Sequence, residues 1–325
     1  MTVRVAGVIT IFALLIHFGA LDLTKMRMMV LRWWSGVAAV CFMTSVVISA
    51  FRWRILLCAV NIRLRISLVM RLSFIGSAFS TIIPGAVSGD MVKAYYLVKG
   101  SSDKTTEAVM TILLDRVVAL FTMLLTGAAA IGAVLLLMPQ NAQNADQMNI
   151  LRHLGYIVTG SAIIVLLGFM FCLNKWLRQT RLAIWLTTQA PVHRIIEKMY
   201  STIYSFRNMK SRLGKAIVVS FIGQLPLVIG MYCIARAADE TTLKFAYYFF
   251  LSPLSALLNS IPLGPGGLGS GEALVEALFM LFGSIHGAEI TAVGHLIFMF
   301  FSIIGFTLYI RGKGEYADTT LITQS

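Results

Sequence analysis

Charged side chains inside apolar stretches are the residues of this sequence that could do chemistry. Asp90 and Lys93 follow an interruption in the run "TIIPGAVSGDMVKAYYLV", and Asp115 and Arg116 lie within "TILLDRVVALF". An ionisable group at membrane depth is costly and usually serves a function. The carboxylate of Asp90 could bind a cationic or hydroxyl-rich lipid headgroup, or a coupling proton.

The same residues could also satisfy one another. Lys93 lies one helical turn after Asp90, so the two can pair, and Lys93 could equally hold a phosphate. Asp115 and Arg116 are adjacent and point about 100° apart on a helix, so each needs another partner. Asp90, Lys93 and a lipid phosphate are the candidates. The alternative for Arg116 is that it extends to the membrane interface and has no role in binding.

A second interruption, "NSIPLGPGGLGSGEALVEALF", leads to Glu272, and Glu276 shares the same helix face one turn later. Asp90 and Glu272 both stand where a helix should begin. They are therefore either acids that cap their helices or residues of a site.

Proline and glycine interrupt both runs. Non-helical backbone at membrane depth is tolerated only where protein buries it or where it lines a wet cavity. Glycine adopts unusual dihedrals and lets a ligand approach the main chain, so free amides there could bind a lipid phosphate. The alternative is a kink that serves packing alone. The residues concerned are Pro84, Gly85 and Gly89 in the first run, and Pro262, Gly264, Gly266, Gly267 and Gly269 in the second.

The composition places these residues in a membrane. Of 325 residues, 58% are hydrophobic and 13% are charged, and the mean hydropathy is +0.82. A soluble domain has about 25% charged residues. The long Leu-, Ile- and Val-rich segments without strict alternation indicate an all-α polytopic protein. The net charge of +13 fits cytoplasmic loops facing anionic lipid rather than nucleic acid.

No catalytic or cofactor motif is present in the sequence. The four cysteines form no C-x-x-C pair, and there is no H-E-x-x-H, P-loop or G-x-S-x-G sequence. Neither a metal nor a cofactor is expected, and no soluble domain is available to bind a donor substrate. We therefore do not expect an autonomous enzyme.

About six full spans are predicted, at 4–21, 34–51, 117–138, 154–173, 215–235 and 289–310. Two shorter apolar segments, 67–83 and 245–262, end at the interruptions, and the short helical pieces 91–98 and 272–283 follow. The basic segment 174–215 and loop 52–66 should face the cytoplasm. Loops 139–152 and 236–244 should face outward, and both termini inward. The basic loop 22–33 conflicts with this by falling outside.

This threading turns the interrupted segments into two re-entrant hairpins that enter from opposite faces. "SGD" at 88–90 and "SGE" at 270–272 match at an offset of 182 residues (270 − 88). Paired broken helices in inverted halves point to a transporter site near the midplane. The chain is thus expected to be one domain, 1–325, with halves 1–152 and 215–325 and a cytoplasmic amphipathic linker at 174–214.

Three ordered motifs, "IIPGAVSGDMVKAYYLV", "AVMTILLDRVVAL" and "IPLGPGGLGSGEALVEALF", resemble the lysylphosphatidylglycerol synthase transmembrane-region family. The family is flippase-like and is related to the membrane half of aminoacyl-phospholipid synthases. The chain departs from the family pattern at Ser88 (Gly), Lys93 (Arg) and Gly271 (Arg). The last change removes a cation, so phosphate binding in the second hairpin would depend on backbone amides.

The resemblance implies that lipid moves between leaflets, with the hairpins meeting at a central cavity. We expect a flippase of a bacterial or archaeal cytoplasmic membrane that acts on an anionic lipid or a glycolipid. The alternatives are a non-transporting scaffold for a separately encoded lipid-modifying transferase, and an intramembrane transferase with Asp90 or Glu272 as base. An oligomer is compatible with the sequence, and nucleic acid is not an expected partner.

Overall fold

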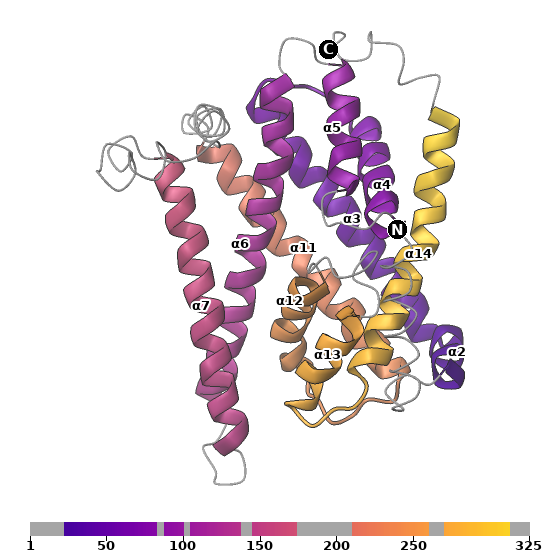
Figure 1. Cartoon of the computed structure of the whole chain (residues 1–325), viewed down its shortest axis with the longest axis vertical. Helices are drawn as coiled ribbons and strands as arrows, with labels where there is room; N and C mark the ends of the chain where they lie inside the picture. The colour runs from indigo at the N-terminus through magenta and orange to yellow at the C-terminus, as the bar shows by residue number, and fades with distance from the viewer. Residues whose placement is uncertain are drawn as a thin grey trace.

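The computed structural model describes residues 23–82, 88–100, 105–137, 145–173, 210–259 and 270–312 (Figure 1). Every regular element in these ranges is a helix, which confirms the all-α class. In chain order the elements are α2 (Leu23–Leu31), α3 (Trp33–Ala59), α4 (Ile66–Ile82), α5 (Ser88–Gly100), α6 (Thr105–Leu137), α7 (Ala145–Leu173), α11 (Lys210–Ala237), η4 (Phe245–Tyr247), α12 (Tyr248–Asn259), α13 (Ser270–Met280) and α14 (Gly287–Gly312).

Among the described helices, 5 are long and apolar enough to cross a membrane, namely α3, α6, α7, α11 and α14. Their outer surfaces carry large apolar side chains such as Trp33, Leu136 and Ile164, which are 66%, 87% and 71% exposed. Extensive apolar surface of this kind is rare on a soluble monomer and is accommodated by lipid. The protein is therefore a multi-pass membrane protein. The predicted span 4–21 lies outside the described residues.

Several predicted boundaries are wrong. α7 begins at Ala145, inside the predicted outward loop 139–152, rather than near residue 154. α3 continues to Ala59, so Arg52 and Arg54 belong to this helix and not to a loop. α6 begins at Thr105 rather than near residue 117, and α2 occupies most of the predicted loop 22–33. For α3 and α6 the physical reason is that a membrane helix can continue through charged residues when these find partners inside the bundle.

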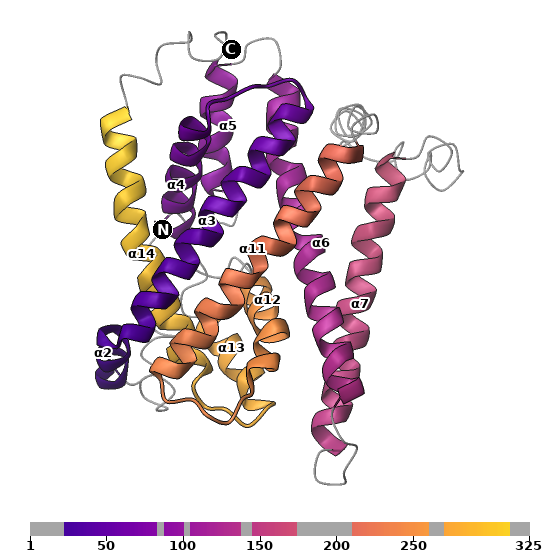
Figure 2. The same cartoon turned by 180° about the vertical axis from the view of Figure 1, so that it is seen from behind.

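Two pairs of short helices lie in opposite halves of the molecule. α4 and α5 pack together in the upper half of Figure 1, and α12 and α13 pack together in the lower half (Figures 1 and 2). Each pair also contacts a long helix from the other part of the chain, α4 with α14 and α12 with α6. The helices α4, α5 and α6 begin at residues 66, 88 and 105, and α12, α13 and α14 begin at 248, 270 and 287. All three pairs of helix starts therefore keep the offset found between "SGD" and "SGE".

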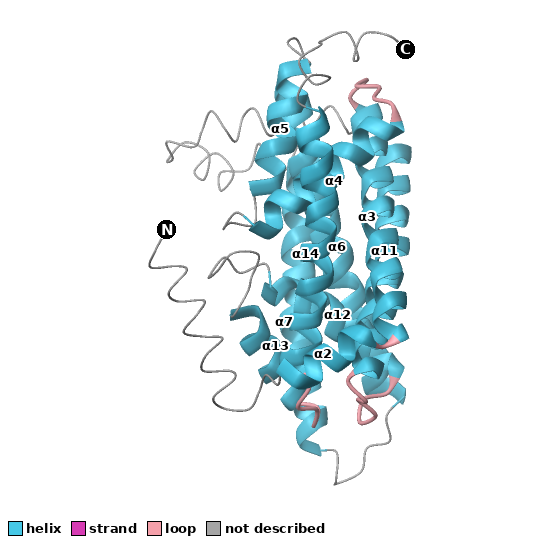
Figure 3. Ribbon diagram, turned by 90° about the vertical axis from the view of Figure 1, so that its right-hand side faces the viewer, coloured by secondary structure: helices cyan, strands magenta, loops and turns pink. Residues whose placement is uncertain are grey.

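The helices α3 and α11 lie side by side over most of their length and connect the two halves (Figure 3). One apolar core includes Phe42 of α3 and Ile234 of α11. A second core packs Trp53 of α3 against Leu72 of α4 and Leu97 of α5. This second core holds the α4–α5 pair against α3, and so brings the charged residues of α5 close to those of α3 and α6.

Glu240 closes the turn that follows α11. Its carboxylate accepts hydrogen bonds from the amides of Thr242 (2.5 Å) and Leu243 (3.3 Å) and from the hydroxyl of Ser284. Burial alone would raise the pKa of Glu240, but the hydrogen bonds from Ser284 and Thr242 outweigh it and lower this pKa from its ordinary value of 4.5. The ionised carboxylate of Glu240 therefore stabilises the folded state at neutral pH. This contribution to the free energy of unfolding is lost as the pH falls below 4.5 and through the lowered pKa.

We expect the thermal stability of the wild type to exceed that of Glu240→Gln at neutral pH, and the difference to shrink as the pH falls below about 4.5. Glutamine does not titrate, so its variant lacks this pH-dependent contribution. Thermal unfolding of both proteins in the same detergent at several pH values measures the difference. A constant difference across the series would contradict the prediction.

Candidate functional site

Five charged residues from three helices gather in the upper half of the molecule. Arg52 comes from α3, Asp90 and Lys93 from α5, and Asp115 and Arg116 from α6, and we call this set the charged cluster. The side chains of Arg52, Asp90, Lys93 and Asp115 are at most 15% exposed, whereas that of Arg116 is 53% exposed. The cluster is thus a buried charge network with one cation at its surface.

Arg52 and Asp115 form the buried centre of the charged cluster. Arg52 Nε lies 2.7 Å from Asp115 Oδ1, and Nη2 lies 2.9 Å from Oδ2, so the pair is bidentate. The remaining guanidinium donors bind the hydroxyls of Ser220 on α11 (2.9 Å) and Ser49 on α3 (3.2 Å). This geometry gives a buried ion pair most of the hydrogen bonds that it needs.

Asp90 binds both other cations. Its two carboxylate oxygens accept hydrogen bonds from Arg116 Nε (2.6 Å) and Nη2 (3.1 Å), and Lys93 Nζ lies 3.8 Å from Oδ1. The predicted pairing of Asp90 with Lys93, and the choice of Asp90 as a partner for Arg116, are both confirmed. Asp90 is the third residue of α5, and its carboxylate reaches across to α6.

Aromatic and hydroxyl groups extend the charged cluster. The Lys93 ammonium lies 5.1 Å from the centre of the Trp53 ring, in cation–π geometry, and the Trp53 indole donates to Thr111 Oγ1 (3.3 Å). Below Arg52, the Ser220 hydroxyl lies 2.7 Å from that of Thr122. A polar path thus runs from α5 through α3 to the facing sides of α6 and α11.

The position of these residues along their helices places the charged cluster deep in the bundle. Asp90 stands about 15 Å from the far end of α5, Asp115 about 15 Å from the start of α6, and Arg52 about 10 Å from the end of α3, at about 1.5 Å per residue. The hydrocarbon core of a bilayer is about 30 Å thick. The charges therefore lie about two to three helical turns in from these helix ends.

The charge of the cluster is unbalanced. Among the described residues, three cations face two carboxylates, which leaves one positive charge over. Within the described ranges, no group of three or more His, Cys, Asp or Glu residues is arranged to hold a metal ion. The chemistry that this arrangement offers is therefore the binding of an anion by Arg116 and Lys93.

Glu272 opens α13 in the lower half, as Asp90 opens α5 in the upper half. Its carboxylate is fully buried, and Oε1 lies 2.8 Å from Nδ1 of His295 on α14. Glu276 faces the same helix, because its Oε2 accepts a hydrogen bond from the amide of Ala288 (2.7 Å). Its other oxygen, Oε1, is buried without a hydrogen-bond partner in the described part of the chain. The structure keeps these acids near α14 and does not add them to the charged cluster.

The glycines of the predicted site fall into two groups. Gly89 is an ordinary helical residue of α5 and not a source of unusual dihedrals, and a Cβ atom there would lie 1.9 Å from the carbonyl oxygen of Gly76 on α4. Its role is close packing of the two short helices. The other predicted residues at the interruptions, Pro84, Gly85, Pro262, Gly264, Gly266, Gly267 and Gly269, lie outside the described residues.

Two partners were missed from the sequence. Arg52 stood in a predicted cytoplasmic loop, although it is the partner of Asp115. His295 was not among the predicted site residues, although it contacts Glu272. In both cases the signal was a single ionisable residue in an apolar segment, and its partner lay too far along the chain for helical spacing to indicate it.

Comparison with known proteins gives the same family as the sequence motifs. No protein of curated function matches the chain. The family described as "Lysylphosphatidylglycerol synthase TM region" matches residues 2–309, which is nearly the whole chain and includes both the charged cluster and the Glu272–His295 pair. The chain therefore belongs to the lysylphosphatidylglycerol synthase transmembrane-region family.

Proposed function

We propose that this protein moves a lipid with a phosphate-bearing headgroup from one leaflet of the cytoplasmic membrane to the other. The observation that carries the proposal is the positive excess of the charged cluster inside a bundle of membrane helices. Every charge of the cluster has a partner, but Asp90 serves two cations, and one of these, Arg116, is 53% exposed. A ligand that brings a negative charge would balance this excess.

The exposure of the cations supports a headgroup as that ligand. Arg116 is bound to Asp90 on one side and is half exposed on the other, so its remaining donors can reach a phosphate. Lys93 stands next to it as a second donor. An arginine fork and a lysine ammonium are the usual ligands of phosphate groups, and the lipid tails can stay in hydrocarbon while the headgroup is bound.

The short helices support transport rather than static binding. We interpret α4–α5 and α12–α13 as re-entrant hairpins that enter from opposite faces and belong to two inverted repeats, since they lie in opposite halves and recur at one offset. Paired hairpins of this kind mark the substrate sites of secondary transporters. The connection after α3, with Arg63 and Arg65, and the start of α11, with Arg212 and Lys215, would then face the cytoplasm together with both termini.

The protein would act as a carrier and not as an enzyme. Its substrate would be an anionic phospholipid or a glycolipid with a phosphate, and an enzyme encoded elsewhere would modify the lipid before or after the transfer. Lys93 is held by a cation–π contact with Trp53 and by an ion pair with Asp90, and neither contact activates it as a nucleophile.

Reconstitution tests this function. The vesicles contain phosphatidylglycerol with a fluorescent label, and a membrane-impermeant reductant added outside quenches only the label in the outer leaflet. The wild type should move labelled lipid from the inner to the outer leaflet, so that the reductant quenches this fraction as well. Lys93→Ala should lower the initial rate about tenfold or more, because a hydrogen bond to a charged group contributes about 1.5–3 kcal/mol. Lys99→Ala is the matched control, since Lys99 is an exposed residue two turns further along the same helix.

The outcomes separate clearly. If the wild type moves neither phosphatidylglycerol nor any other phosphate-bearing lipid, the proposed function is rejected. If Lys93→Ala and Lys99→Ala reduce the rate equally, the charged cluster is not the headgroup site.

A further inference from the structure

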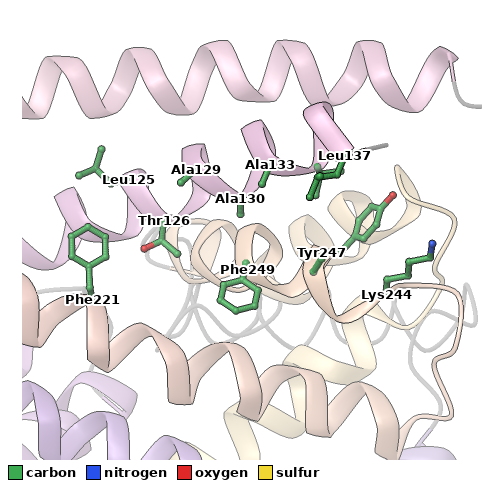
Figure 4. Close-up of a pocket in the computed structure, with 12 residues that line it drawn as sticks. Leu125, Thr126, Ala129, Ala130, Ala133, Leu137, Phe221, Lys244, Tyr247 and Phe249 are labelled. Atoms are coloured by element: carbon green, nitrogen blue, oxygen red, sulfur yellow. The ribbon is translucent and has the colours of Figure 1, made fainter. Parts of the chain in front are cut away.

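An apolar groove runs along the lower half of α6, on the side that faces α11 and α12 (Figure 4). Its volume is about 780 Å³, within the range of about 300–1,000 Å³ of small-molecule sites. One wall is the stretch of α6 from Leu125 to Leu137, and Phe221 of α11 and Phe249 of α12 form the opposite wall. The groove is separate from the charged cluster, none of whose residues lines it.

The dimensions of the groove suit one hydrocarbon chain. The wall from Leu125 to Leu137 is about 18 Å long at about 1.5 Å per residue, close to the thickness of one leaflet of a hydrocarbon core of about 30 Å. Ala129 and Ala133 are both exposed and stand one turn apart on this wall, so small side chains leave room along its middle. The hydroxyl of Thr126 donates a hydrogen bond to the carbonyl of Thr122 in its own helix (2.8 Å), so this donor needs no polar group from a ligand.

The two ends of the groove differ in charge. Lys244 and Tyr247 stand at the Leu137 end, and Phe221 stands at the Leu125 end (Figure 4). The Lys244 side chain is exposed, and no carboxylate of the described residues pairs with it. An apolar channel one leaflet deep with a cation at its outer end is complementary to an anionic lipid, whose negative headgroup and apolar tail are spaced in the same way.

We propose that this groove binds one acyl chain of an anionic phospholipid, with the headgroup phosphate at Lys244 and the end of the chain near Thr126. This inference rests on the lipid-transport function proposed above. It assigns a site that holds a lipid of the leaflet on the Lys244 side of the protein. The upper end of the groove leads toward Thr122, whose hydroxyl lies 2.7 Å from that of Ser220, the residue that Arg52 binds. A lipid in the groove would therefore lie directly below the charged cluster.

Photolabelling tests the site without any need for transport. The protein is reconstituted with phosphatidylglycerol that carries a diazirine at the end of one acyl chain, and the labelled peptides are mapped by mass spectrometry. We expect label on the α6 stretch 125–137 and on the α11 or α12 residues that face it. Ala133→Trp should abolish this label, because the indole ring fills the groove. Leu136→Trp is the control and should preserve the label, because position 136 is 87% exposed and lies outside the groove.

The headgroup is tested by changing the charge at the end of the groove. Lys244→Glu should reduce labelling by phosphatidylglycerol at least severalfold, and labelling by a matched phosphatidylcholine probe should fall much less. Equal loss for both probes would overturn the assignment of Lys244. Label absent from α6, or unaffected by Ala133→Trp, would overturn the groove as a lipid site, including the case in which apolar residues 4–21 of this chain occupy it.

The labelling result and the transport result can be read separately. A protein that moves lipid but shows no label in the groove keeps the proposed function and loses this inference. A protein that shows the label but moves no lipid keeps the binding site and loses the transport function.

Discussion

Replacing Asp115 by alanine is expected to destabilise the folded protein by about 3–5 kcal/mol, the largest effect that we expect from a single side chain. The substitution leaves the Arg52 guanidinium buried, with only the hydroxyls of Ser220 and Ser49 as partners. Arg52→Ala should have an effect of similar size, because it leaves the Asp115 carboxylate buried and unpaired. Unfolding in mild detergent, followed by thermal melting or by titration with a denaturing detergent, measures the loss.

The double variant Arg52→Met with Asp115→Leu distinguishes the loss of the ion pair from the cost of leaving one of its charges buried without a partner. Apolar replacement of both partners removes the charges together, so most of the stability should return. Asp146→Ala is the control, because Asp146 is an exposed acid in the first turn of α7 and should contribute less than about 0.5 kcal/mol. A double variant as unstable as either single variant would show that the ion pair is not the source of the effect.

Gly89→Ala is expected to separate α4 from α5 at a cost near or above the upper end of the about 1–3 kcal/mol range for overpacking. The added Cβ would lie 1.9 Å from the carbonyl oxygen of Gly76 and 2.3 Å from the hydroxyl of Ser80. The first of these atoms belongs to helix backbone and cannot rotate away. The shift should also move Asp90, the next residue, and so lower the rate of the proposed lipid transport along with stability.

Two glycines provide controls for Gly89→Ala. Gly132→Ala on α6 meets nothing within 4 Å and should leave stability unchanged or slightly raised, because alanine favours the helix. Gly271→Ala on α13 meets the side-chain oxygen of Asn259, which can rotate, so its effect should be smaller than that of Gly89→Ala. Similar melting temperatures for all three variants would contradict the close packing of α4 and α5.

The positions of the main helices could be predicted from hydropathy, since lipid requires long apolar segments wherever a helix crosses. Their lengths could not. The predicted span 117–138 lacked the first part of α6, because Asp115 and Arg116 interrupt the apolar run, and this part is helical as far back as Thr105. The cost of these charges is offset by Arg52 and Asp90, and such compensation arises only after the helices have packed.

The charged cluster could be predicted in part for the same reason. Asp90, Lys93, Asp115 and Arg116 were recognisable because each is an ionisable residue in apolar surroundings. Local spacing could relate Lys93 to Asp90 but could not assign Arg52, which precedes Asp115 by 63 positions. Similarly, Glu272 and His295 are 23 residues apart and lie on different helices. Pairing across a bundle depends on tertiary contacts that a single sequence does not encode in a periodic pattern.

If the protein carries a phosphate-bearing lipid as proposed, the shared offset of the helix starts has a consequence for the energy of the phosphate along its route. Asp90 and Glu272 correspond at this offset, but Arg52, Lys93 and Asp115 correspond to Ile234, Val275 and Ile297. The backbone is thus duplicated, whereas the cations belong to one copy alone. A phosphate on the proposed route would therefore meet an electrostatic minimum in the copy that holds the cations and none at the equivalent point of the other copy. Two structurally similar halves would then give an uneven energy profile, in which the release step differs for the two directions of travel.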